Sequence, residues 1–157
     1  MLYQRIRHDG PAVLLLLALL VQLALLLKGY IYPLAEKIWE VRHLSAVDRS
    51  AEIAFGSDFA SYMRFLREQV PSDARVVVPP VDREPVYGNI GLMQYFLFPR
   101  EVVNCPSGPD LSECVRSMGG SRSHILAIGN FPDPRDVPPG KTLSELMDGQ
   151  GIYLPPR

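Results

Sequence analysis

The sequence predicts a small α/β domain on a single transmembrane helix, and three observations indicate this fold class. Residues 11–27 form an apolar run without a charged side chain. Four short apolar segments, at residues 75–78, 101–104, 124–128 and 152–154, have the length and boundaries of strands. Segments with helical periodicity separate these strands, and such connections form right-handed crossovers. We therefore expect three layers, with a mostly parallel sheet of about four strands covered on both faces.

The apolar run is long enough for a membrane span. Its 17 residues include ten leucines, one glutamine and no charge. A helix continued through Lys28 to Tyr32 reaches the ~30 Å thickness of the hydrocarbon core, because each residue adds about 1.5 Å. We therefore predict a transmembrane helix over residues 11–32. A cleaved signal peptide is the alternative, since Arg5 and Arg7 form a basic leader, but Tyr32 stands where cleavage requires a small residue.

The charges beside this helix predict its orientation. Arg5, Arg7 and the amino terminus precede the span, whereas three basic residues follow it closely, so the two counts nearly tie. The short basic leader is typical of a signal anchor, and the cysteine pair suits an oxidising compartment. We therefore expect a cytoplasmic tail over residues 1–10 and an extracytoplasmic domain on the plasma (inner) membrane. The lipid bilayer is thus the first expected partner.

A juxtamembrane helical stalk is predicted over residues 33–56. Its apolar residues recur at intervals of three or four, which is the helical period: Leu34, Ile38, Val41, Leu44, Val47, Ala51 and Phe55. A dimerising coiled coil is the alternative, but this apolar seam lasts only about three heptads. We expect the helix to lie against its own domain or a membrane neighbour.

The soluble α/β domain is predicted over residues 57–157. Its first helix has an apolar face from Phe59 to Val70 and ends at Val70-Pro71, because a residue before proline avoids the helical region. A valine-rich strand follows. Residues 87–98 are apolar nearly all round, which predicts a buried helix.

The second half of the domain repeats this order. After the second strand, the capping box at residues 110–113 (Asp-Leu-Ser-Glu) starts a helix that ends at Gly119. After the third strand, residues 142–145 (Thr-Leu-Ser-Glu) form a second capping box. We therefore expect a short helix that ends near Gly149, before the last strand.

Composition and motifs argue against several functions. The 16 Lys and Arg residues balance 17 Asp and Glu residues, and no basic stripe exists for nucleic acid. The sequence has no Gly-rich phosphate loop and no recognisable nucleophile and base, and two cysteines without a histidine pair do not make a structural zinc site. We predict no catalytic, cofactor-binding or metal-binding residue and no cofactor.

Cys105 and Cys114 are a candidate disulfide. Their bond would close a ten-residue loop between the second strand and the following helix. The alternative is that both are reduced, because Cys114 shares an apolar helix face with Leu111, Val115 and Met118, where a small thiol packs well.

Three polar loops are the candidate ligand site. They follow the first three strands, at residues 79–89, 105–110 and 129–141, and ligands of open parallel sheets bind beyond the carboxyl ends of the strands. The candidate contact residues are Asp82, Arg83, Asn130 and Asp133. Mixed charges of this kind suit a glycan or a polar head group. Ordinary solvation of loops is the alternative explanation.

Two segments resemble parts of known envelope proteins. They are Tyr62-x-x-Phe65-Leu66-Arg67 with Val70-Pro71-x-Asp73-Ala74-Arg75-Val76-Val77-Val78-Pro79, and Gln94-Tyr95-Phe96-Leu97-Phe98-Pro99-Arg100-x-Val102. They are similar to extracytoplasmic α/β segments of bacterial envelope membrane proteins, including polytopic glycosyltransferases that use polyprenyl-linked sugars. Such enzymes carry their catalytic carboxylates in loops between many spans, and this chain has one predicted span. The resemblance implies an envelope setting and an accessory domain.

These observations define the functional expectation. We expect a non-catalytic, membrane-anchored extracytoplasmic domain that acts as a subunit or accessory of a bacterial envelope or membrane assembly, with a membrane or envelope protein as partner. The alternative is a module that binds an envelope saccharide and assists a membrane glycosyltransferase.

Overall fold

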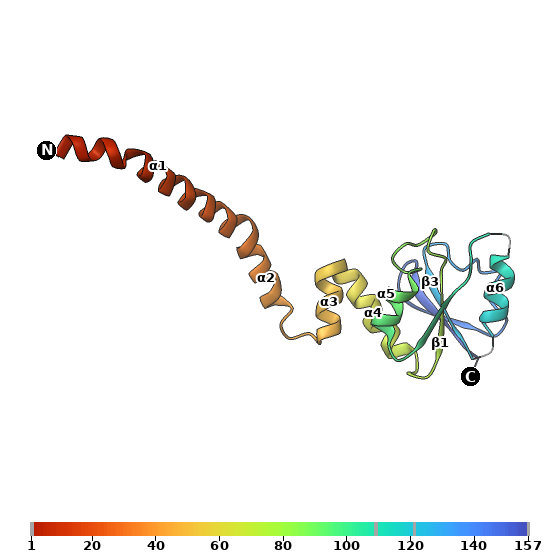
Figure 1. The fold of residues 1–157 in the computed structure, drawn as a ribbon. Helices are drawn as coiled ribbons and strands as arrows, with labels where there is room; N and C mark the ends of the chain where they lie inside the picture. Colours follow the sequence, from red (N-terminus) through yellow and green to blue (C-terminus); the bar gives the residue numbers. More distant parts are fainter. Residues whose placement is uncertain (1, 109, 121, 157) are drawn as a thin grey trace. The chain divides into compact units, whose positions relative to one another are not determined.

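The computed structural model describes residues 2–108, 110–120 and 122–156, and the chain divides into two compact units (Figure 1). The first unit is Met1–Leu44 and the second is Ser45–Arg157. Three residues with predicted places lie outside the described residues. They are Met1 of the predicted tail, Pro109 of the second ligand loop and Arg157 of the predicted domain.

The first unit contains the apolar helix. It comprises α1 (Leu2–Leu26), a π-helical turn η1 (Leu27–Ile31) and α2 (Tyr32–Glu40). The segment Ala12–Glu40 has 29 residues, and its most apolar stretch of 18 residues has a mean hydropathy of 2.4, so the helix is long and apolar enough to cross a membrane. None of this apolar stretch is buried by the part of the protein that the structure describes, which is consistent with a helix that needs lipid around it.

The expectation of one juxtamembrane helix over residues 33–56 is wrong, because the chain forms two separate helices there. After α2 ends, residues 41–44 form turns, and α3 (Ala46–Phe55) starts a new helix. Ser45 caps α3, because its Oγ accepts a hydrogen bond from the Asp48 N–H at 3.1 Å. The apolar period continues through this break, so periodicity alone does not reveal it. Ala51 of α3 is fully buried in the domain core.

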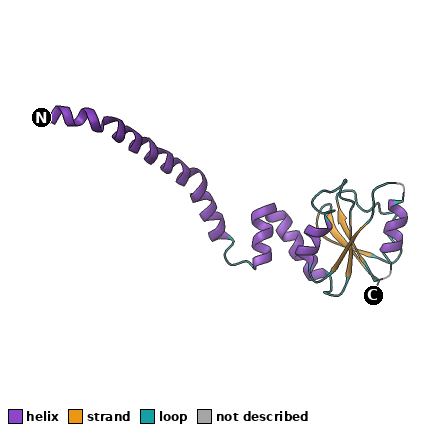
Figure 2. Cartoon of the chain, viewed as in Figure 1, coloured by secondary structure: helices purple, strands orange, loops and turns teal. Residues whose placement is uncertain are grey.

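The domain has one sheet of five strands, in the order β2-β1-β3-β5-β4. Figure 2 shows these strands in orange, with helices beside them. The strands are β1 (Arg75–Val78), β2 (Glu101–Asn104), β3 (His124–Ile128), β4 (Thr142–Met147) and β5 (Gln150–Leu154). β1 pairs in parallel with β2 and β3, whereas β5 is antiparallel to β3 and β4 is antiparallel to β5. The sheet is therefore mixed and has five strands, which corrects the expected mostly parallel sheet of about four.

The three expected layers are present. Residues of α4 (Ser57–Gln69) and α5 (Ile90–Leu97) share a core with one sheet face, which includes Val76, Leu126 and Ile152. Residues of α6 (Leu111–Met118) share a second core with the other face, including Val77 and Ile125. The alternation of Val76 and Val77 between the two cores follows the strand period of two.

The predicted helix at residues 142–149 is the strand β4, and this is the largest error of the sequence-based prediction. Asp148 and Gly149 form the turn between β4 and β5, with Met147 paired to Gln150. Gly149 has φ 73°, a conformation that glycine adopts readily. An Asp-Gly pair between apolar residues is a strong hairpin signal, and here it outweighs the capping-box pattern.

α5 is exposed on one face, although a helix buried all round was expected. Asn89 caps it through a hydrogen bond from the Leu92 N–H to Oδ1 at 3.0 Å. Met93 and Leu97 are completely buried, but 58% of Tyr95 is exposed. The domain is too small to cover α5 with a further layer, so apolar side chains remain at the surface.

Tyr62 of α4 bridges the antiparallel strands β3 and β5. Its hydroxyl lies 2.6 Å from the Gly151 carbonyl and 2.9 Å from the Ala127 carbonyl. Gly151 and Ala127 face each other in the antiparallel β3–β5 pair. Burial raises the pKa of this phenol far above its usual value, so Tyr62 remains a neutral donor.

Candidate functional site

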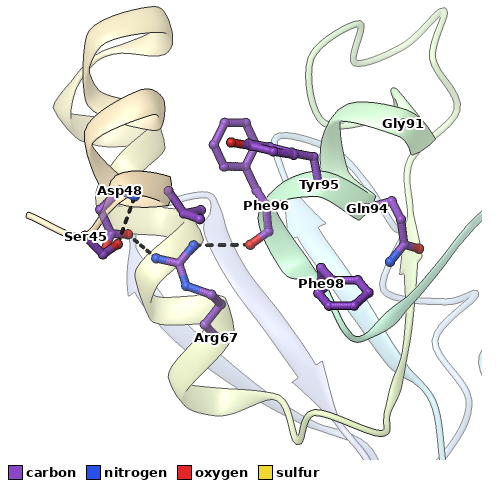
Figure 3. Close-up of a pocket in the computed structure, with 9 residues that line it drawn as sticks. Ser45, Asp48, Arg67, Gly91, Gln94, Tyr95, Phe96 and Phe98 are labelled. Carbon is purple, nitrogen blue, oxygen red and sulfur yellow. Dashed lines mark hydrogen bonds and ion pairs between the residues drawn. The ribbon is translucent and has the colours of Figure 1, made fainter.

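An apolar groove lies on the domain beside α3, α4 and α5 (Figure 3). It has a volume of about 600 Å³. It is defined by Ser45, Val47, Asp48, Arg67, Gly91, Gln94, Tyr95, Phe96 and Phe98. These residues come from the start of α3, from α4, and from α5 with the residue that follows it. Phe98 is 74% exposed, which is unusual for a phenylalanine in a small domain.

The polar groups at one side of the apolar groove are paired with each other. Arg67 forms an ion pair with Asp48 and donates a hydrogen bond to the Phe96 carbonyl at 3.2 Å. Ser45 Oγ donates to the second Asp48 oxygen at 2.7 Å. Burial favours the neutral carboxyl, but Ser45 and Arg67 outweigh it and hold the pKa of Asp48 below its usual value.

This geometry suits binding rather than reaction. The Asp48 carboxylate is ionised and held by two donors, so it is a poor general base. Gln94 is also engaged, because its amide donates to the Arg100 carbonyl and accepts from the Val102 N–H. Apolar rings therefore form the part of the groove that is free to contact another molecule.

The three predicted ligand loops meet at the carboxyl ends of the parallel strands. Ser107 donates a hydrogen bond to Asp82, which joins the loops after β1 and β2. This hydrogen bond lowers the pKa of Asp82. A Cβ atom on Gly129 would lie 3.2 Å from Glu84 Oε1, so the loop after β3 approaches the loop after β1.

Arg83 and Asp133 line one small hollow between these loops. Its volume is about 200 Å³, and Leu111, Ser112 and Asp136 are also in its lining. Ser112 Oγ donates to Asp136 at 2.8 Å, so this carboxylate is already occupied.

Asn130 and Asp133 line a second hollow, of about 420 Å³, which we call the hairpin hollow. The other lining residues are Ala127, Gly129, Phe131, Pro132, Pro134, Leu143, Glu145, Gly149, Gln150, Gly151 and Tyr153. Arg135 binds Asp133 through its guanidinium, at 2.7 and 3.0 Å, and through its backbone N–H. These bonds lower the pKa of Asp133 to about 2.

The four predicted contact residues are thus only partly brought together. Asp133 shares one hollow with Arg83 and the other with Asn130, whereas Asp82 lines neither. Sequence reasoning missed Glu145 and Tyr153, because their segment was predicted as helix and final strand rather than as a hairpin. The Asp148-Gly149 pair is the signal that could have placed them on one sheet face.

His124 and the cysteines have structural surroundings. His124 is 4% exposed at the amino end of β3, away from the three ligand loops. Cys105 and Cys114 form a disulfide, with their Cα atoms 5.7 Å apart. In residues 2–108, 110–120 and 122–156, no three His, Cys, Asp or Glu side chains are grouped to hold a metal ion.

Comparison with family models, with curated proteins and with solved structures finds no match.

Proposed function

We propose that this chain is a membrane-anchored, non-catalytic accessory subunit, and that the apolar groove binds a protein partner in the same membrane. The observation that carries this proposal is the exposure of Phe98 and Tyr95 beside a groove whose charged residues, Asp48 and Arg67, are paired. Exposed aromatic rings in a hollow are typical of interface hot spots. Because the charges of Asp48 and Arg67 neutralise each other, the groove favours a partner with an apolar surface over one with a charged surface.

The apolar helix supports the choice of a membrane protein as partner. Anchoring two proteins to one membrane raises their effective concentration, so a modest interface is sufficient. The resemblance of the domain to envelope proteins supports an envelope assembly as the setting. We assign no catalytic role to the domain.

Co-purification tests the proposed partner. The tagged full chain is extracted from its membrane in a mild detergent, together with Phe98→Ser and Val81→Ser variants. Val81 is 50% exposed and lies outside the groove lining, so it is the matched control for loss of an exposed apolar side chain. We expect a second membrane protein to co-purify in stoichiometric amount with the wild type and with the Val81 variant. The Phe98 variant is expected to purify without this protein.

A photo-crosslinking residue at position 98 identifies the occupant directly. A crosslink to a different membrane protein supports the proposal. A crosslink only between copies of this chain would assign the groove to self-association, and a lone chain that retains no partner would contradict the accessory role.

We also propose that the amino terminus is cytoplasmic and that the domain is extracytoplasmic, on the plasma (inner) membrane. The basic leader with Arg5 and Arg7 and the disulfide of the domain support this orientation. Protease added to spheroplasts is expected to remove the domain. Cleavage only after the membrane is permeabilised would reverse the proposed orientation.

A further inference from the structure

The hairpin hollow lies on a part of the sheet face that α6 leaves open. The core around α6 includes Ile125 of β3, with Tyr153 packed at its edge. In the sheet register, Ile125, Tyr153 and Leu143 form one row across β3, β5 and β4. The next row on this face is Ala127, Gly151 and Glu145. The hollow therefore lies over the second row and the outer part of the first.

The hollow exists because two of these positions carry little or no side chain. Ala127 contributes one methyl group, and Gly151 contributes none. A Cβ atom on Gly151 would lie 2.5 Å from the Ser144 carbonyl oxygen and 3.1 Å from the Glu145 Cα atom. The close approach of β4 to β5 therefore requires glycine here, and the sheet surface stays open above it.

Two polar side chains at the hollow are free to bind a ligand. Within the described part of the chain, neither the Asn130 amide nor the Glu145 carboxylate has a hydrogen bond or ion pair. Both residues are exposed. The half-buried Tyr153 ring and Leu143 supply an apolar surface in the same hollow.

This combination of groups selects one chemical class of ligand. The lining contains no Lys or Arg, and Arg135 already pairs with Asp133, so the unpaired Glu145 carboxylate gives the hollow a negative charge that disfavours anions. Asn130 offers two donors and an acceptor, and Glu145 offers acceptors. Hydroxyl groups match both Asn130 and Glu145, because a hydroxyl group can donate and accept hydrogen bonds. An ammonium group only donates, so it would leave the donors of the Asn130 amide without an acceptor.

We propose that the hairpin hollow binds a neutral saccharide. The apolar face of a sugar ring packs on Tyr153 and Leu143, and its hydroxyl groups bond to Asn130 and Glu145. The volume of about 420 Å³ lies within the range of small-molecule sites. The site shares no residue with the apolar groove, so it is independent of the proposed protein partner.

The test uses the full chain in phosphatidylcholine nanodiscs, one chain per disc, because sugar-headed detergents would compete for the site. The probes are three neutral trisaccharides, maltotriose, cellotriose and chitotriose, with trigalacturonate as the anionic probe and the glucosamine trimer as the cationic one. Saturation-transfer NMR and titration measure binding. We expect at least one neutral probe to bind with a Kd of about 1 mM or tighter, and trigalacturonate not to bind.

Asn130→Ala and Glu145→Ala are each expected to weaken that binding about tenfold. Asp148→Ala is the matched control, because Asp148 is an exposed acidic residue of the same hairpin but does not line the hollow. The affinity of this variant for the saccharide should equal that of the wild type. Circular dichroism checks that each variant is folded. The proposal is overturned if no neutral probe binds at about 10 mM, if only the glucosamine trimer binds, or if both alanine variants bind like the wild type.

Discussion

Arg100 is a buried cation whose partners are backbone carbonyl groups. It is 7% exposed, and its guanidinium donates to the carbonyls of Val70 at 2.8 Å, Arg67 at 2.6 Å and Leu97 at 3.4 Å. These carbonyls belong to the last turns of α4 and α5, where the helix dipoles favour positive charge. Arg100 thus satisfies both helix ends and joins them.

Replacing Arg100 is expected to destabilise the domain strongly. Arg100→Met leaves the buried Val70 carbonyl and the partly buried Arg67 carbonyl without these donors, so we expect the free energy of unfolding to fall by about 3 kcal/mol. Urea unfolding of residues 45–157, followed by circular dichroism, measures the change. Arg75→Met is the control, because the Arg75–Glu101 ion pair is exposed and should contribute less than about 1 kcal/mol. Equal effects of the two substitutions would refute the role of Arg100.

His124 is expected to make stability depend on pH. Burial, followed by the charges of Lys141 and Arg100, lowers the pKa of the imidazole below 6.5, although a hydrogen bond with the Arg75 backbone opposes this. The folded state therefore binds the proton less well than the unfolded chain. The stability contributed by neutral His124 is complete above pH 6.5 and is lost as the pH falls below that value.

A chain of residues 45–157 isolates this effect, because His124 is its only histidine. We expect its free energy of unfolding to be lower at about pH 5.5 than at about pH 7.5, and we expect His124→Gln to remove most of the difference. An equal pH dependence in the variant would assign the effect to other groups.

At the level of single residues, the sequence predicted some of the candidate contacts and missed others. Asn130 and Asp133, which line the hairpin hollow, were predicted as contacts because polar residues that follow a buried strand meet at one sheet edge. Glu145 and Tyr153 were missed because only the β3–β5–β4 register brings them to the same hollow as Asn130. That register depends on tertiary pairing, which residue type alone does not specify.

At the scale of elements, a close backbone contact holds the loop between β1 and α5 in place. A Cβ atom on Gly88 would lie 2.7 Å from the carbonyl oxygens of Pro79 and Pro80. We expect Gly88→Ala to lower the free energy of unfolding by about 2 kcal/mol, because backbone atoms must move.

Gly91 is the matched control for this prediction. It lies in α5, and the nearest atom to its Cβ position is Asn89 Oδ1 at 3.5 Å. Gly91→Ala is expected to increase stability by about 0.5–1 kcal/mol, since alanine is the better helix former. Urea unfolding of residues 45–157 compares the two variants. Destabilisation by both would show that α5 itself, rather than the Gly88 contact, is intolerant.

Elements with local signals could be predicted, and those set by packing could not. The parallel strands β1, β2 and β3 are apolar runs with turn residues at their ends. The break between α2 and α3 was missed because the apolar period passes through Ser45. The predicted burial of α5 was wrong because periodicity reports the polarity of a helix and not the number of layers available to cover it.

At the scale of the whole molecule, the disulfide and the membrane orientation are linked predictions. If the domain is extracytoplasmic, protein isolated without reductant should have no reactive thiol when denatured, because Cys105 and Cys114 are joined. Thiol labelling measures this. Reduction is then expected to lower the free energy of unfolding by about 2–3 kcal/mol. Two reactive thiols per chain would contradict both predictions.

The position of β4 at the edge of the sheet has a consequence for solubility. An outer strand presents unpaired N–H and C=O groups, which can pair with a strand of another molecule and begin aggregation. Glu145 is the only charged residue in β4. The apolar residues Leu143, Leu146 and Met147 of the same strand are partly exposed. The Glu145 carboxylate therefore also acts as a gatekeeper against edge-to-edge association between copies.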